Sequence, residues 1–157
     1  MSLEREERLA SEIKDLLGSR AVEIKIQRIR SIFVTVKKED YKESIRKVVD
    51  RFAITHLSTI TGADSGQTID VMPHFSYAGT KITFKSSVPK TAAEIDTLTD
   101  IIPGAVMYER EIHDLLGVGF KGHPTPERFI LPDDWPSDVY PLRKEYKVAR
   151  PEPIPKT

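Results

Sequence analysis

The 157-residue sequence contains no cysteine. Disulfide bonds, thiolate nucleophiles and cysteine ligands for zinc or iron–sulfur clusters are therefore excluded. Uninterrupted apolar runs extend over only a few residues, far short of the roughly 20 that a membrane-spanning helix needs. The first seven residues are mostly charged and contain no apolar segment, so no secretory signal is predicted there.

A surplus of charge of either sign is also missing. The chain has 24 lysines and arginines against 24 aspartates and glutamates, which argues against a strongly basic nucleic-acid binder. Hydrophobic residues make up 39% and charged residues 31%, which is typical of a folded soluble chain. The length fits one domain of roughly 100–150 residues followed by a tail.

Hydrophobic periodicity predicts an α+β domain. Residues 3–17 carry apolar side chains at helical spacing, and Gly18 is placed to end that helix. A second helix is predicted over residues 40–53, with Asp40 as its N-cap. Alternating patterns predict strands at residues 22–26, 32–36, 54–61, 68–77 and 80–86.

Two further helices are predicted, over residues 91–101 and 105–116, the latter ending at Gly117. Pro73 is expected at a sheet edge or a bulge, because proline has no N–H for the ladder. The order of elements favours a mostly antiparallel sheet with helices packed on one face, followed by an extended proline-rich C-terminal tail. We therefore expect an α+β domain over residues 1–117 and a tail over residues 118–157.

The tail combines prolines with large apolar side chains. Eight of the 11 prolines lie in residues 121–157 and disfavour helix there. A flexible linker would not need aromatic residues such as Phe129, Trp135 and Tyr140. We expect an ordered segment that packs along its own domain or along a partner, and we expect residues 149–157 to be frayed or partner-bound polyproline.

The predicted helix 105–116 is unusually rich in charge. Arg110 and Asp114 lie four residues apart and can pair, as can Glu109 and His113. Glu109 and Glu111 border opposite flanks of the apolar stripe. A solvated face is the usual reason for such a run, and contacts at the edge of the domain are the alternative.

The same residues give little support for a metal site or for an acid–base pair of an enzyme. Glu109 and His113, with His123 and Asp133, contain metal-ligating side chains, but no second pair has the spacing to complete a site. Asp133 and Asp134 are more typical of a turn than of a general acid and base. We predict no catalytic residue, no metal site and no cofactor. His56 and His74 are expected to be ordinary strand residues, and no glycine-rich phosphate loop is present.

Several stretches resemble the 30 kDa subunit family of respiratory complex I, the NADH dehydrogenase. Residues 87–147 carry the resemblance densely, whereas residues 1–86 match only in their order of elements. Ile112-His113 replaces the valine–tyrosine pair usual in complex I and is more similar to the related subunits of energy-converting hydrogenases and formate hydrogenlyases. The matching motifs are SVP at 87–89, LTDIIPGA at 98–105, YEREIHDLLG at 108–117, GHP at 122–124, RFILPDDW at 128–135 and YPLRKEY at 140–146.

The resemblance implies a subunit in the peripheral arm of a membrane oxidoreductase of the NADH:quinone type. Such a subunit has no active site of its own and scaffolds the large subunit during electron transfer coupled to ion translocation. The alternative is the equivalent subunit of a membrane-bound nickel–iron hydrogenase, a formate hydrogenlyase or a deazaflavin dehydrogenase. A free-standing binding module is a third interpretation.

The implied partners are the large subunit, of 49 kDa or hydrogenase type, and neighbouring iron–sulfur subunits. No nucleic acid is expected, and the membrane would be reached only through the complex, at the cytoplasmic face of the cell membrane. The residues that we expect at the subunit interface or in positioning the tail are Glu109, Arg110, Glu111, Asp114, His123, Arg128, Asp133, Asp134, Trp135, Tyr140 and Arg143.

Overall fold

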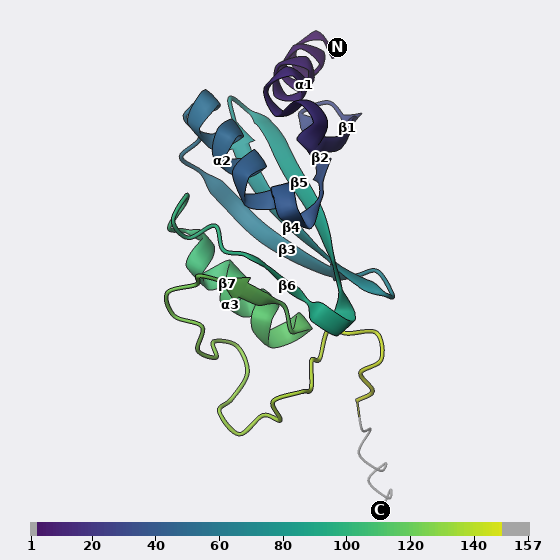
Figure 1. Cartoon of the computed structure of the whole chain (residues 1–157), viewed down its shortest axis with the longest axis vertical. Helices are drawn as coiled ribbons and strands as arrows, with labels where there is room; N and C mark the ends of the chain where they lie inside the picture. The colour runs from purple at the N-terminus through teal and green to yellow at the C-terminus, as the bar shows by residue number, and fades with distance from the viewer. Residues whose placement is uncertain (1–2, 149–157) are drawn as a thin grey trace, which may run out of the picture.

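A computed structural model describes residues 3–148, and the predicted polyproline at 149–157 lies outside that range. A five-stranded sheet with the order β1-β2-β5-β4-β3 forms its centre (Figure 1). The helices and strands are α1 (Glu4–Leu17), β1 (Ala21–Arg28), β2 (Ser31–Val36), α2 (Tyr41–Phe52), β3 (Leu57–Asp64), β4 (Thr68–Tyr77), β5 (Thr80–Pro89), β6 (Glu94–Asp96), α3 (Ala105–Leu116) and β7 (Gly119–Lys121).

The sheet is mostly antiparallel, as the sequence predicted. Only β2 and β5 run parallel, with Ile32 beside Ile82 and Val34 beside Phe84. A hairpin joins β4 to β5, and Ala78 and Gly79 adopt the positive φ angles that a tight two-residue turn requires. The α+β fold class is therefore confirmed.

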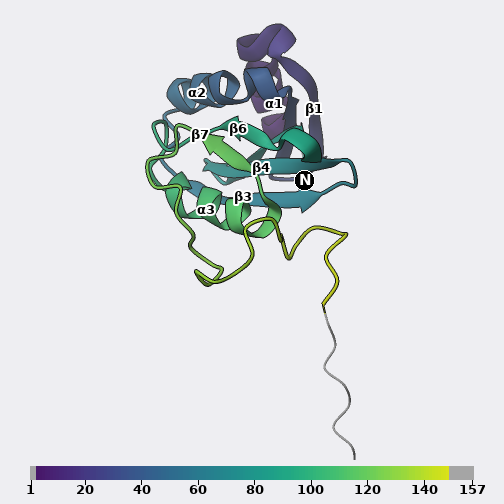
Figure 2. The ribbon, with the colours of Figure 1, turned by 60° about the horizontal axis from the view of Figure 1, so that its bottom comes forward.

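One face of this sheet holds the apolar core. Ile32, Val34, Phe75, Ile82 and Phe84 are all completely buried. They share a face because side chains alternate along each strand and the paired residues are in register. Figure 2 shows α1 and α2 together on one side of the sheet.

Helix α3 packs along the edge strand β3, and Gly62 makes this close approach possible. A Cβ atom at residue 62 would overlap Cδ1 of Leu116 and lie 3.4 Å from Ile112. The hydroxyl of Tyr108 also donates a hydrogen bond to the Ser58 carbonyl, at 3.1 Å. The missing side chain thus sets the distance between strand and helix.

The helix predicted over residues 91–101 is wrong. The structure has a short 3-10 turn at Lys90–Ala92 and then strand β6, which pairs in parallel with β7. Ile95, Leu98 and Ile102 are buried at helix-like spacing. Their burial instead follows from the pairing with β7, which lies beyond α3 in the sequence, and from a turn in which Leu98 accepts hydrogen bonds from the N–H groups of residues 101 and 102.

The sequence predicts a sheet edge or a bulge for Pro73, and the edge is wrong. It lies in β4, which has neighbours on both sides. It is accommodated because the ladder between β4 and β5 is interrupted there: paired positions run from Thr68 to Val71 and resume at His74.

The segment that follows α3 begins with β7 and then continues without regular secondary structure to residue 148. We call residues 118–148 the C-terminal segment. Its first residues are joined to the rest of the fold by β6, and the division after residue 117 stays a prediction. Within the described residues, no helix combines the length and the apolar character needed to cross a membrane.

Candidate functional site: helix α3 and the C-terminal segment

Helix α3 is contacted on several sides by different parts of the chain. Gly117, in the left-handed conformation with φ of 73°, ends it and turns the chain back. Ile112 and Leu116 face β3. Arg110 and Asp114 turn toward the C-terminal segment, and Glu109 turns toward residues 97 and 98. The charged residues of α3 are therefore not all solvated: Glu109 and Asp114 are buried, and Arg110 is half-buried.

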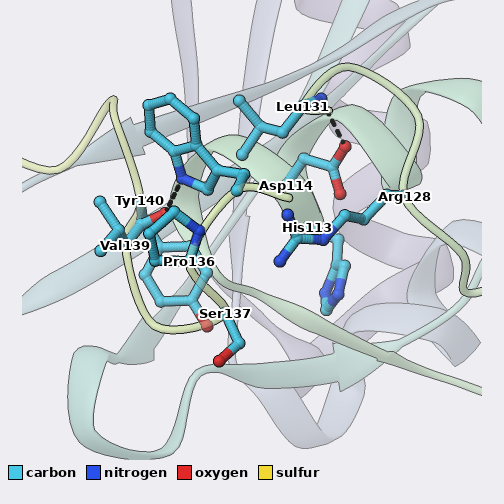
Figure 3. A pocket seen from close by; sticks show the side chains of 9 residues that line it. His113, Asp114, Arg128, Leu131, Pro136, Ser137, Val139 and Tyr140 are labelled. Atoms are coloured by element: carbon cyan, nitrogen blue, oxygen red, sulfur yellow. Dashed lines mark hydrogen bonds between the residues drawn. The ribbon is translucent and has the colours of Figure 1, made fainter. Parts of the chain in front are cut away.

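Asp114 binds the backbone of the C-terminal segment. Its Oδ2 atom accepts N–H hydrogen bonds from Phe129 at 2.8 Å and Ile130 at 2.7 Å. It accepts a third from Leu131 at 3.2 Å (Figure 3). Burial alone would raise the pKa of this carboxyl, but the three N–H donors outweigh that effect and hold the pKa below its usual range. A single carboxylate thus satisfies three successive backbone donors that lack strand partners.

Arg110 binds carbonyls of the same stretch. Its Nε atom donates to Glu127 O at 2.9 Å, and its Nη2 atom donates to Arg128 O at 2.7 Å. The guanidinium also lies 5.2 Å from the centre of the Phe129 ring. Among the described residues no ion pair joins Arg110 to Asp114; each of them contacts the segment instead.

Glu109 is completely buried. Its carboxylate accepts hydrogen bonds from Thr97 Oγ1 at 2.5 Å and from Leu98 N at 2.7 Å. Burial raises the pKa of Glu109 to about 7, despite the lowering effect of these two donors. This carboxyl therefore keeps its proton to a higher pH than an exposed glutamate does.

The histidines around Glu109 bind carbonyl oxygens. His123 Nε2 lies 3.1 Å from Val106 O and 3.9 Å from Glu109 Oε2. His113, which the spacing allowed to pair with Glu109, contacts Val118 O at 2.9 Å. Both histidines thus hold the start of the C-terminal segment against α3.

Tyr140 and Arg143 contact the end of α3. The Tyr140 ring lies over Gly117, where a Cβ atom would come within 2.5 Å of it. Arg143 donates from Nε to Leu116 O at 2.8 Å, and its guanidinium stacks on Tyr140 at 4.4 Å from the ring centre. These contacts anchor the middle of the segment to the helix C-terminus.

A cluster that the sequence did not reveal anchors the segment further along. Lys90 Nζ lies 2.6 Å from Asp64 Oδ2 and 2.8 Å from Glu145 Oε2. Asp64 also accepts a hydrogen bond from Lys144 N at 2.8 Å, and this bond and the Lys90 bond hold the Asp64 pKa well below its usual range. These positions are far apart in the sequence, so no spacing rule could have connected them.

Other predicted residues lie nearer the surface. Arg128 donates to Pro132 O at 3.0 Å, and Trp135 Nε1 donates to Val139 O at 2.8 Å, so both brace turns within the segment. Asp133 and Asp134 are exposed, and Glu111 lines a groove of about 200 Å³ between α3 and β3.

The segment also exposes large apolar side chains. Phe129 is 42% exposed, Ile130 48% and Leu142 57%. Contact with another protein would remove these side chains from water.

The described residues contain no group of three or more histidine, aspartate or glutamate side chains placed to hold a metal ion. Glu109 and His123 form only a pair. The pocket beside Asp114, Arg128 and Tyr140 measures about 50 Å³, which is room for one or two water molecules (Figure 3). A larger groove of about 210 Å³ lies beside Glu109, His113 and His123.

Comparison with known proteins finds a matching family and related subunits. Residues 34–152 match the family described as respiratory-chain NADH dehydrogenase, 30 kDa subunit. Membrane-bound hydrogenase subunit beta of Pyrococcus furiosus is 27% identical over 90% of this chain and 86% of the relative. An NADH-quinone oxidoreductase subunit of Chloroherpeton thalassium is 34% identical over 74% of this chain, and the match spans only 50% of that relative.

A solved structure extends the likeness to the fold. A chain of the membrane-bound sulfane sulfur reductase, an archaeal respiratory membrane complex, superposes with a TM-score of 0.82 at 27% identity. The match covers 91% of this chain and 86% of the other.

Proposed function

Since this chain belongs to the family of the respiratory-chain NADH dehydrogenase 30 kDa subunit, we propose that it is a peripheral-arm subunit of a complex I-related membrane oxidoreductase. Its role is scaffolding. It binds the large subunit of the complex, next to the iron–sulfur subunits, and fixes the geometry on which electron transfer coupled to ion translocation depends. It carries no catalytic residue and no cofactor of its own, and it associates with the membrane through the complex, at the cytoplasmic face.

The exposed apolar side chains of the C-terminal segment carry this proposal. Phe129, Ile130 and Leu142 lie on a backbone that Arg110, Asp114 and Arg143 fix against α3. Binding to a rigid surface costs less conformational entropy than binding that must first order a chain. The fixed segment is therefore suited to present apolar anchors to the large subunit.

The site residues divide into two proposed roles. Glu109, Arg110, Asp114, His123, Arg128, Trp135, Tyr140 and Arg143 position the segment through the contacts described above. Glu111, Asp133 and Asp134 are exposed and would meet the partner directly.

A hydrogenase-type or sulfur-reductase-type complex is the second candidate. The matches with P. furiosus hydrogenase subunit beta and with the archaeal respiratory complex cover 90% and 91% of this chain, whereas the match with the C. thalassium subunit covers 74% of it. This near-complete coverage favours the energy-converting branch of the family.

The test is an affinity purification of the tagged full-length chain from native membranes, followed by mass spectrometry. We expect a large redox subunit and membrane subunits to co-purify, and the cysteine motifs of the large subunit to distinguish hydrogenase from dehydrogenase. Replacing Phe129, Ile130 and Leu142 by aspartate should abolish the co-purification. Ile29→Asp is the matched control, because Ile29 is 40% exposed but lies in the β1–β2 turn. Equal recovery with both variants would contradict the proposed surface.

Charge reversal at Arg110 tests the positioning role. Arg110→Glu should reduce recovery of the complex more than it lowers the melting temperature of the purified chain, because its contacts are to the C-terminal segment rather than to the core. An unchanged yield of complex would count against this role.

A further inference from the structure

The two edges of the central sheet are treated differently. Strand β3 is covered by α3, whose Tyr108 even binds a carbonyl of that strand. Strand β1 pairs with β2 alone, and Figure 1 shows it at the margin of the molecule. Within residues 3–148, nothing pairs with its outer edge. The outer edge of β1 is therefore a template for another strand, and its register with β2 is regular from Glu23 to Ile26, between two irregular pairs.

Side chains along β1 are sorted by face. Ile24 and Ile26 are opposite Val34 and Ile32 of β2 and share the apolar face of the sheet, where they are half-buried. Glu23 and Lys25 are exposed on the other face. Val22, at a bulge in the β1–β2 register, is 59% exposed.

We propose that β1 pairs antiparallel with β1 of a second copy of this chain, with Ile24 opposite Ile24 at the two-fold axis. In this register Glu23 of each copy faces Lys25 of the other. Opposite charges directly across two strands are stabilising, and the two half-buried Ile24 side chains cover each other. The two sheets would become one continuous ten-stranded sheet.

The charge pattern selects this register over its neighbours. A shift by two residues places Glu23 opposite Glu23, or Lys25 opposite Lys25, and both arrangements bring like charges together. A shift by one residue places Ile24 opposite a charged residue and exchanges the faces. Parallel pairing in register places Glu23 beside Glu23 and Lys25 beside Lys25, which again brings like charges together. Only the antiparallel register centred on Ile24 pairs opposite charges on one face and apolar side chains on the other.

Such pairing is compatible with the proposed function because it uses the sheet edge opposite to α3 and the C-terminal segment. A contact of one strand from each partner is small, so the affinity is modest. We expect association in the micromolar range, on the order of 10–100 μM.

Sedimentation velocity on the purified full-length chain tests the proposal. The wild-type chain should shift from the 17.8 kDa monomer toward a dimer over a concentration series reaching about 300 μM. Glu23→Lys and Lys25→Glu should each remain monomeric, because each variant brings only like charges together. Circular dichroism and the melting temperature serve as controls of folding, since both positions are exposed.

Mixing the two single variants provides the decisive measurement. One variant then presents two lysines and the other two glutamates, so an equimolar mixture should dimerise although neither component does. The double variant E23K/K25E should likewise recover self-association. A wild-type chain that stays monomeric, or a dimer unaffected by the single substitutions, would overturn the proposal. Because the measurement uses the purified chain, its outcome is independent of whether the affinity purification recovers a large subunit.

Discussion

The sheet and the C-terminal segment are held in place by different means. The sheet is fixed by completely buried apolar side chains such as Phe75, Ile82 and Phe84. The segment exposes several of its apolar side chains and is held by polar side chains that bind its backbone. Apolar burial is non-directional and spread over many contacts, whereas hydrogen bonding to an irregular backbone depends on a few groups in exact positions. The segment is therefore the part of the molecule whose placement a single polar substitution can alter.

The largest expected change in stability concerns the apolar core of the sheet. Phe84→Ala should lower the free energy of unfolding by about 3–5 kcal/mol, because Phe84 is completely buried and stacks edge-on against Phe75. Urea denaturation measures the change. The matched control is Phe129→Ala in the C-terminal segment, where the ring is 42% exposed, and a loss of about 1 kcal/mol or less is expected. Equal losses at both positions would remove the contrast between the two regions.

The next effect concerns the buried carboxyl between the two regions. The pKa of Glu109 is raised from 4.5 to about 7 in the folded chain, so the folded state retains the proton more strongly than the unfolded state. The free energy of unfolding should therefore fall as pH rises from 4.5 to about 7, by roughly 3 kcal/mol from this group.

Glu109→Gln should remove that part of the pH dependence, because an amide stays neutral and can still accept the N–H of Leu98. Urea denaturation at intervals between pH 4.5 and 8 measures the slope. Glu111→Gln on the exposed side of α3 is the control and should keep the wild-type slope. The same slope for wild type and Glu109→Gln would show that the raised pKa does not govern stability.

The smallest expected effect concerns the hydrogen bonds from Asp114 to the C-terminal segment. Asp114→Asn removes the charge that three N–H donors share, and the free energy of unfolding should fall by about 1–2 kcal/mol. Amide hydrogen exchange should accelerate at Phe129, Ile130 and Leu131, while strand β5 stays protected. Asp133→Asn, an exposed aspartate of the same segment, should change neither quantity. Uniform acceleration over the whole chain would mean that Asp114 stabilises the sheet as well.

Local periodicity was sufficient to predict most of the fold. Helices α1, α2 and α3 and four strands of the sheet lie close to their predicted bounds, because each buries one regularly spaced face. Strand β3 begins and ends three residues later than the predicted 54–61. The pairing of β6 with β7 was missed, since Ile95 and Leu98 have helical spacing and their partner strand follows α3. A long-range pairing of three residues leaves no local pattern.

The site was predicted as a set of residues but without its geometry. The sequence identified Glu109 as bordering the apolar stripe of α3, yet its complete burial depends on Thr97 and Leu98, which were assigned to a helix that does not exist. Helical spacing predicts that Arg110 and Asp114 pair with each other. It cannot predict that both instead bind the backbone of an irregular segment packed on the helix. The cluster of Asp64, Lys90 and Glu145 has no sequence signal at all.

The Tyr140 ring on Gly117 imposes an order on folding. The ring has a place to dock only after α3 has ended in its left-handed turn, and Asp114 and Arg110 present their binding groups only once that helix exists. On the ribosome these residues emerge before the stretch that they bind, since synthesis proceeds from residue 110 toward residue 140. We therefore expect a newly made chain to complete its sheet and third helix first, and the proposed partner surface to take shape last.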